Sequence, residues 1–188
     1  EPKGTAHAVL AAKSALEGFE GTGLILLGDA PCLSGASLRT LLEQHSERGA
    51  QLSLLSGRVA DPTGYGRVVR GVDGELAKIV EEKDADETVR SLDEINSGIF
   101  ALELPVSWEV LEKIQPSAKT GELYVTEAIE LTKIAGARAQ AVIAASTGEV
   151  LGVNDRRQLA QVTGILRERI NAEHMRAGVT LVDPSSAF

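Results

Sequence analysis

The sequence has few of the features that mark secreted, membrane-spanning or nucleic-acid-binding proteins. Its single cysteine, Cys32, excludes an internal disulfide and favours a reducing, cytoplasmic location. No apolar run reaches the roughly 18 residues that a membrane-spanning helix needs, so we expect no membrane partner. The formal net charge of −8 argues against a nucleic-acid partner, because general nucleic-acid binders present a basic surface.

The composition is otherwise that of an ordinary globular domain. Hydrophobic residues make up 43% of the 188 positions and charged residues 24%, which is enough for the core of one domain. The start, Glu1-Pro2-Lys3-Gly4, has neither a secretory leader nor an initiator methionine, so we expect a piece of a longer protein. An acidic chain can still bind one nucleotide, which needs only local positive charge and backbone N–H groups.

The rest of the chain is organised around residues 24–31, with the sequence LILLGDAP. Four consecutive apolar residues predict a strand that is buried on both faces. Gly28 breaks this strand, and Pro31, which lacks an N–H group, prevents it from continuing. We therefore expect Asp29 at the carboxyl end of a parallel strand, where a carboxylate suits a divalent cation that bridges phosphates. A turn residue or a helix cap is the alternative for Asp29.

The order of the predicted elements indicates an α/β protein with a mostly parallel, mixed sheet flanked by helices. A helical pattern at 34–48 separates the strand at 24–27 from an apolar strand at 50–59, and this β-α-β alternation is typical of parallel sheets. Further strands are predicted at 67–70, 75–82, 99–102 and 138–145, and further helices at 4–19, 105–114, 121–135 and 155–176.

Two glycine-containing segments could bring the backbone close to a ligand. Gly4 and Thr5 open the first helix, whose N–H groups could meet an anion or a base edge; an ordinary helix with Thr5 as N-cap is the alternative. The loop at 61–67, with the sequence DPTGYGR, contains Gly66 in a tight turn, but a plain hairpin connection would have the same pattern.

Polar side chains at the ends of strands and helices form a second group of candidates. Glu81 ends an apolar strand, which is also the usual place for a solvated charge cluster. Asn96 begins another strand and could bond either the backbone or a sugar hydroxyl. Asn154 precedes Asp155, the predicted N-cap of the long helix, and offers a neutral oxygen as a second metal ligand with Asp29.

Eight motifs occur in order along nearly the whole chain: GTAHAV, LLGDAP, DPTGYGR, IVEEKDA, EINSGI, GELYVTE, GVNDR and GVTLVDP. Together they resemble the uridylyltransferase half of the bacterial bifunctional N-acetylglucosamine-1-phosphate uridyltransferase/glucosamine-1-phosphate acetyltransferases. The resemblance implies a Rossmann-like nucleotide-sugar transferase fold. It also implies transfer of UMP from UTP to N-acetylglucosamine 1-phosphate, giving UDP-N-acetylglucosamine and pyrophosphate for peptidoglycan and lipopolysaccharide precursors.

The resemblance also assigns roles to the candidate residues. Asp29 and Asn154 match the two protein ligands of a catalytic Mg²⁺, which makes them the expected catalytic and metal-binding pair. Substrate contacts are implied for Asp29 itself, for Gly4 and Thr5 with uridine, and for Gly66, Glu81, Asn96 and Asn154 with the N-acetylglucosamine part. Thr126 lies in a motif near the sugar.

The chain departs from the family pattern in several places. It begins after the family's Gly-rich LxAGxGTRM loop, its lysine and the first strand, so we expect a truncated domain that is weakly active or inactive alone. Residues 1–176 are assigned to the uridylyltransferase domain and 177–188 to the start of a left-handed β-helix. Because the full-length family trimerises mainly through that β-helix, we expect a monomer or a weak oligomer. Leu27 and Glu127 stand where the family often has Tyr and Asp.

Two rival interpretations stay open. The missing phosphate loop is compatible with a catalytically dead nucleotide-sugar-binding module. A relative that acts on glucose 1-phosphate or mannose 1-phosphate is a third possibility, although the motifs EINSGI and GVNDR fit the N-acetylglucosamine enzymes better. The main hypothesis requires that Asp29 and Asn154, which are distant in the sequence, lie close enough to share one cation.

Overall fold

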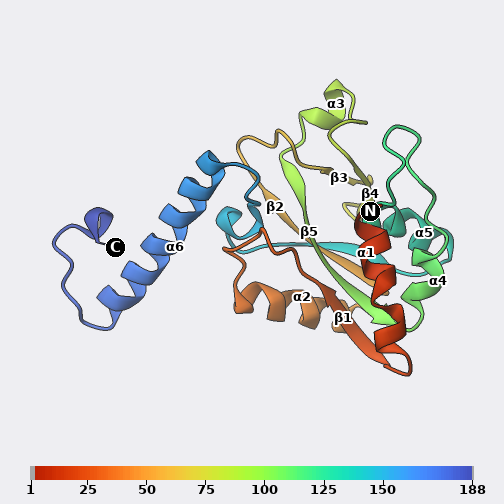
Figure 1. The fold of residues 1–188 in the computed structure, drawn as a ribbon, viewed down its shortest axis with the longest axis horizontal. Helices are drawn as coiled ribbons and strands as arrows, with labels where there is room; N and C mark the ends of the chain where they lie inside the picture. Colours follow the sequence, from red (N-terminus) through yellow and green to blue (C-terminus); the bar gives the residue numbers. More distant parts are fainter. Residues whose placement is uncertain (1–2, 188) are drawn as a thin grey trace.

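Six strands form one mixed sheet in the computed structural model, which describes residues 3–187 (Figure 1). They are β1 (Gly21–Ile25), β2 (Leu52–Arg58), β3 (Arg67–Arg70), β4 (Leu76–Val80), β5 (Glu94–Leu104) and β6 (Ala139–Ile143). The strand order is β4-β3-β5-β2-β6, and β1 pairs with β5 beside this path. The predicted α/β class, with a mixed sheet flanked by helices, is therefore confirmed.

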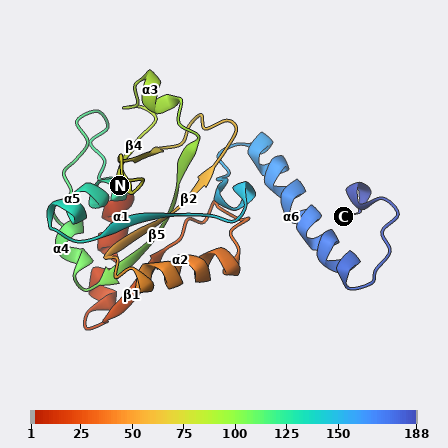
Figure 2. The same cartoon turned by 180° about the vertical axis from the view of Figure 1, so that it is seen from behind.

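Helices cover both faces of the sheet. They are α1 (Thr5–Ala11), α2 (Gly35–Glu47), α3 (Glu87–Arg90), α4 (Ser107–Leu111), α5 (Ala128–Ile134) and α6 (Arg156–Arg176), with short 3₁₀ helices η1 (Lys13–Leu16), η2 (Val125–Glu127), η3 (Thr147–Val150) and η4 (Pro184–Ser186). Figures 1 and 2 show α2 on one face and α1, α4 and α5 on the other. None of the described helices is both long and apolar enough to cross a membrane.

The two faces of the sheet carry separate cores, because successive residues of a strand point to opposite faces. In β5, Phe100 and Leu102 belong to the cluster that packs with residues of α1, α4 and α5. Ile99 and Ala101 alternate with them and join a second cluster, which includes the fully buried Leu41 of α2. This alternation makes β5 the central strand of the domain.

The expectation of a mostly parallel sheet is wrong. Only β2 and β6 are described as parallel neighbours, whereas β5 is antiparallel to β1, β2 and β3, and β4 is antiparallel to β3. The predicted β-α-β unit does give β1 and β2 the same direction, since both oppose β5. However, β5 lies between these two strands and separates them.

The strand predicted at 24–27 is also less buried than expected. It ends at Ile25, and the exposed fractions are 36% for Leu24 and 50% for Leu26. The reason is position: among the described residues, β1 pairs only with β5, so β1 lies at an edge of the sheet. Apolar composition alone does not distinguish an edge strand from a central one.

The helix α6 extends away from the sheet and carries the C-terminal residues (Figures 1 and 2). Its N-cap is Asp155, as predicted, and Asp155 forms a capping box with Gln158. The side chain of Arg169 donates to the carbonyl oxygen of Cys32 at 2.9 Å, which attaches α6 to the loop after Asp29. Residues 177–187 form turns and η4, and their assignment to a β-helix stays a prediction.

Candidate functional site

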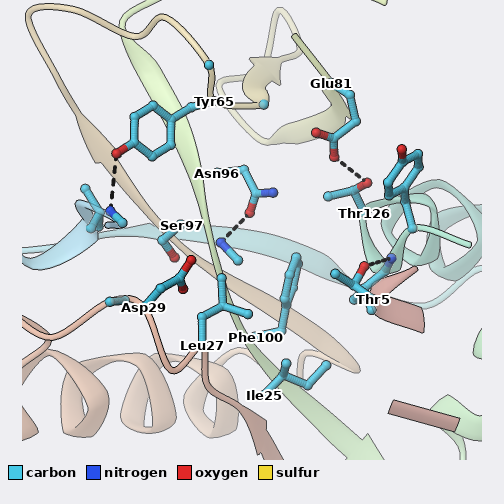
Figure 3. A pocket seen from close by; sticks show the side chains of 18 of the residues that line it. Thr5, Ile25, Leu27, Asp29, Tyr65, Glu81, Asn96, Ser97, Phe100 and Thr126 are labelled. Atoms are coloured by element: carbon cyan, nitrogen blue, oxygen red, sulfur yellow. Dashed lines mark hydrogen bonds between the residues drawn. The ribbon is translucent and has the colours of Figure 1, made fainter. Parts of the chain in front are cut away.

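A cavity of about 270 Å³ opens where β5 has no strand partner along part of one edge. One edge of β5 is taken by β2, so β1 and β3 must share the other edge. On that edge β1 pairs with Phe100 to Leu104, whereas β3 reaches only Ile95. Between these two contacts, Asn96, Ser97 and Gly98 of β5 line the cavity (Figure 3).

A bulge in β5 shapes this wall of the cavity. The pairing with β2 skips from Asn96 to Ile99, so Ser97 and Gly98 have no partner in the register. Gly98 has a φ of +75°, and a Cβ at this position would lie 2.3 Å from Cδ1 of Leu27. The side-chain oxygen of Asn96 accepts a hydrogen bond from the Gly98 N–H at 2.8 Å. The amide nitrogen of Asn96 then remains as a donor at the cavity.

Asp29 and Asn154 both lie close to Gly152. The N–H group of Val153 donates to the main-chain oxygen of Asp29 at 2.9 Å. A Cβ placed on Gly152 would be 4.0 Å from Asp29 Oδ2 and 3.8 Å from Asn154 Nδ2. Both residues also line the cavity, so the structure places them near one another, and their sharing of one cation stays a prediction.

This pair fits a divalent cation but not a metal centre made by protein ligands alone. No cluster of three or more His, Cys, Asp and Glu side chains suited to a metal ion occurs within residues 3–187. One carboxylate and one amide suit a divalent cation that keeps several waters and takes phosphate oxygens as further ligands.

Glu81 and Thr126 form a hydrogen-bonded pair at another wall of the cavity. The hydroxyl group of Thr126 donates to Glu81 Oε1 at 3.0 Å (Figure 3). Burial raises the pKa of Glu81 above its ordinary value; the hydrogen bond from Thr126 opposes this rise, and the nearby charge of Asp84 adds to it. Gly66 lies beside them, since a Cβ on Gly66 would be 3.3 Å from Glu81 Oε2. Its carbonyl oxygen accepts from the N–H of Asn96 at 2.8 Å.

Gly4 and Thr5 take different positions. Thr5 lines the cavity, whereas Gly4 is not among its lining residues. Gly4 has a φ of +102°, and a Cβ there would be 2.4 Å from the carbonyl oxygen of Leu123, so only glycine fits. The alternative of Thr5 as an N-cap is wrong, because Gly4 is the cap residue and the Thr5 hydroxyl accepts from the N–H of Val125 at 3.0 Å.

Several lining residues were not singled out from the sequence. They include two apolar residues and two tyrosines: Ile25, Phe100, Tyr65 and Tyr124. Two features of the sequence could have indicated Tyr65. Aromatic residues make up only 3% of the chain, and Tyr65 lies between two glycines of the DPTGYGR loop.

Comparisons with known proteins agree with this architecture. A profile of the nucleotidyl transferase family matches residues 1–148. The chain is 40% identical over 185 residues to the bifunctional protein GlmU of Geobacillus thermodenitrificans, covering 98% of this chain and 40% of that protein. Identity to GlmU of Geobacter metallireducens is 42% over 188 residues, covering 100% of this chain and 40% of that protein. The chain thus spans about two fifths of the length of these relatives.

A solved structure supports the fold independently of sequence. UDP-glucose pyrophosphorylase complexed with UDP-glucose superposes with a TM-score of 0.68 at 18% identity, covering 90% of this chain and 64% of that chain. This likeness confirms the Rossmann-like nucleotide-sugar transferase fold, and the GlmU matches confirm the resemblance carried by the eight motifs. The chain therefore belongs to the nucleotidyl transferase family.

Proposed function

We propose that this domain transfers UMP from UTP to N-acetylglucosamine 1-phosphate, giving UDP-N-acetylglucosamine and pyrophosphate. The observation that carries the proposal is the convergence of Asp29 and Asn154 beside Gly152, in the same cavity as Glu81 and Thr126. One part of the cavity thus offers cation ligands, and another offers hydrogen-bonding groups for a sugar.

Asp29 and Asn154 would hold Mg²⁺. When bound, this ion supplies positive charge that offsets the charge of the phosphates during transfer. Such a source of charge is needed, because no Lys, Arg or His is among the described residues that line the cavity. Val153 keeps the backbone of Asp29 in place through its N–H group.

The sugar would lie between Glu81, Thr126 and Asn96. The Glu81 carboxylate can accept from sugar hydroxyls, and the Asn96 amide nitrogen can donate to a carbonyl such as that of an acetamido group. Gly66 allows the backbone to approach closely, because it has no side chain between the loop and Glu81. These contacts bind and orient the acceptor rather than react with it.

The reaction class fits a cavity without an activated nucleophile. Transfer of a phosphoryl-type group depends mainly on positioning and on charge stabilisation, since the acceptor phosphate is itself the nucleophile. The hydroxyl of Ser97, which lines the cavity, is engaged with the carbonyl oxygen of Leu55, and that of Thr126 with Glu81. No protein group therefore needs to form a covalent intermediate.

Two measurements test the proposal. Calorimetric titration with UDP-N-acetylglucosamine in the presence of Mg²⁺ should show binding that is weakened by Asp29→Asn, and UDP-glucose should bind less tightly. A coupled pyrophosphate-release assay with UTP, Mg²⁺ and N-acetylglucosamine 1-phosphate tests turnover. Binding by this chain, with no turnover even after the family's upstream Gly-rich loop is restored, would favour the nucleotide-sugar-binding module. Equal affinity for UDP-glucose would favour a different sugar.

Location and assembly are part of the same proposal. The single buried cysteine favours a reducing, cytoplasmic compartment. A monomer or a weak oligomer stays our expectation for residues 1–188, and light scattering coupled to size-exclusion chromatography would measure it.

A further inference from the structure

Tyr65 connects the two sides of the cavity. Its ring packs beside the buried cluster of Val59, Ile95 and Val150. Its hydroxyl oxygen accepts a hydrogen bond from the N–H group of Gly152 at 3.2 Å (Figure 3). The residue therefore joins the loop that contains Gly66 to the segment that contains Asn154.

The backbone of Tyr65 is itself held in place. The guanidinium group of Arg67, only 2% exposed, donates to the carbonyl oxygen of Tyr65. The same guanidinium pairs with a carboxylate oxygen of Glu82 at 2.8 Å, which balances its buried charge. The N–H group of Tyr65 donates to the carbonyl oxygen of Pro62 at 3.2 Å. Both backbone groups of Tyr65 are therefore hydrogen-bonded, which fixes the position from which its side chain extends to Gly152.

The segment at 152–155 depends on a few isolated hydrogen bonds, because it belongs to no helix or strand. Val153 donates to the Asp29 carbonyl oxygen, and both Asn154 and Asp155 donate to the side-chain oxygen of Gln158. Gly152 donates to Tyr65. Each of the four successive N–H groups therefore has one acceptor, and Tyr65 supplies the first.

We infer that Tyr65 is a positioning residue, whose hydroxyl group keeps the segment at 152–154 in place so that Asn154 stays beside Asp29. The ring contributes packing, whereas the hydroxyl fixes the segment that would hold the cation. This inference rests on the proposed function, because it concerns the cation that Asp29 and Asn154 would share.

The variant Tyr65→Phe separates these two contributions, since it keeps the packed ring and removes only the oxygen. The matched control is Thr147→Val. Thr147 lies in η3, which precedes the segment at 152–154, and it does not line the cavity. The variant removes a 2.8 Å hydrogen bond from the Thr147 hydroxyl to the carbonyl oxygen of Arg58. Hydrogen exchange of the Gly152 amide, followed by NMR, reports on the hydrogen bond. Electron paramagnetic resonance of Mn²⁺, with UDP-N-acetylglucosamine present, reports on cation affinity.

We expect Tyr65→Phe to accelerate exchange at Gly152 and to weaken Mn²⁺ binding by about fivefold, the loss expected for one neutral hydrogen bond. The variant Thr147→Val should leave both quantities unchanged. Unchanged Mn²⁺ affinity in Tyr65→Phe, with normal binding by the wild-type chain, would overturn the role of Tyr65 alone. If the wild-type chain bound no Mn²⁺, the proposed function would be wrong, and the inference would be overturned with it.

Discussion

The two sides of the cavity are built in different ways. The side proposed for the sugar is made by Asn96 in β5, Glu81 directly after β4 and Thr126 in η2, and these side chains already make hydrogen bonds within the protein. The side proposed for the cation is made by loops, where Asp29 and Asn154 are held mainly by single backbone hydrogen bonds. Under the proposed function, the sugar is bound by side chains that already pair with other protein groups, whereas the cation is held by segments outside the helices and strands.

The largest effect should come from the cation side. In a protein with the family's upstream Gly-rich loop restored, we expect Asp29→Asn to lower the rate of pyrophosphate release by about a hundredfold or more, because a metal ligand accounts for several kcal/mol of charge stabilisation. The melting temperature should change little, since Asp29 holds the segment at 152–154 through its main-chain oxygen, which the variant keeps. A rate within a few-fold of wild type would show that the carboxylate is only a turn residue.

Gly98 lines the cavity beside Leu27, and its replacement should affect the free energy of unfolding. We expect Gly98→Ala to lower the free energy of unfolding by about 2 kcal/mol, because its φ is +75° and the new Cβ would meet Leu27. Gly28→Ala is the matched control, since a Cβ at Gly28 meets nothing within 4 Å and its φ is not positive. Chemical denaturation measures both variants, and equal losses would contradict the close contact.

The sugar side should respond in affinity more than in rate. We expect Glu81→Gln to raise KM for N-acetylglucosamine 1-phosphate by about tenfold, because a hydrogen bond to a charged acceptor becomes a neutral one. The value of kcat should fall much less. A matching fall in kcat with KM unchanged would place Glu81 on the chemical step and remove the distinction between the two sides.

The smallest effect should be a pH dependence of stability that arises from the same carboxyl group. Burial raises the pKa of Glu81 in the folded protein, so its contribution to stability is complete below the ordinary value of about 4.3 and is lost as the pH rises through the raised value. Glu81→Gln removes this loss, so the variant should gain stability relative to wild type between pH 4 and neutral pH. Urea denaturation at several pH values measures the free energy of unfolding of both proteins. A difference between variant and wild type that stays constant over this pH range would contradict a raised pKa of Glu81 in the folded protein.

Local features of the fold could be predicted from the sequence. Asp155 was expected to cap the long helix because its side chain can accept from nearby N–H groups, and it does so with Gln158. Asp29 does follow a strand in the chain, but β1 ends at Ile25 rather than at Gly28, and Asp29 lies in a turn. These predictions depend on residues that are neighbours in the chain.

The arrangement of the strands could not be predicted in this way. The insertion of β5 between β1 and β2 depends on pairing between residues that are distant in the sequence, such as Leu54 with Phe100, 46 residues apart, and Leu24 with Ala101, 77 residues apart. The same holds for the exposure of Leu26 and for the bond between Tyr65 and Gly152. In each case the decisive partner is set by tertiary contacts that local patterns do not encode.

The way in which α6 begins has a mechanical consequence. Gln158, in the first turn of α6, accepts hydrogen bonds from the N–H groups of both Asn154 and Asp155. Asn154 is therefore fastened to the base of a helix of 21 residues that projects from the body like a lever. A load that tilts the far end of this helix is therefore transmitted to the loop after Asp29 through Arg169 and to Asn154 through Gln158.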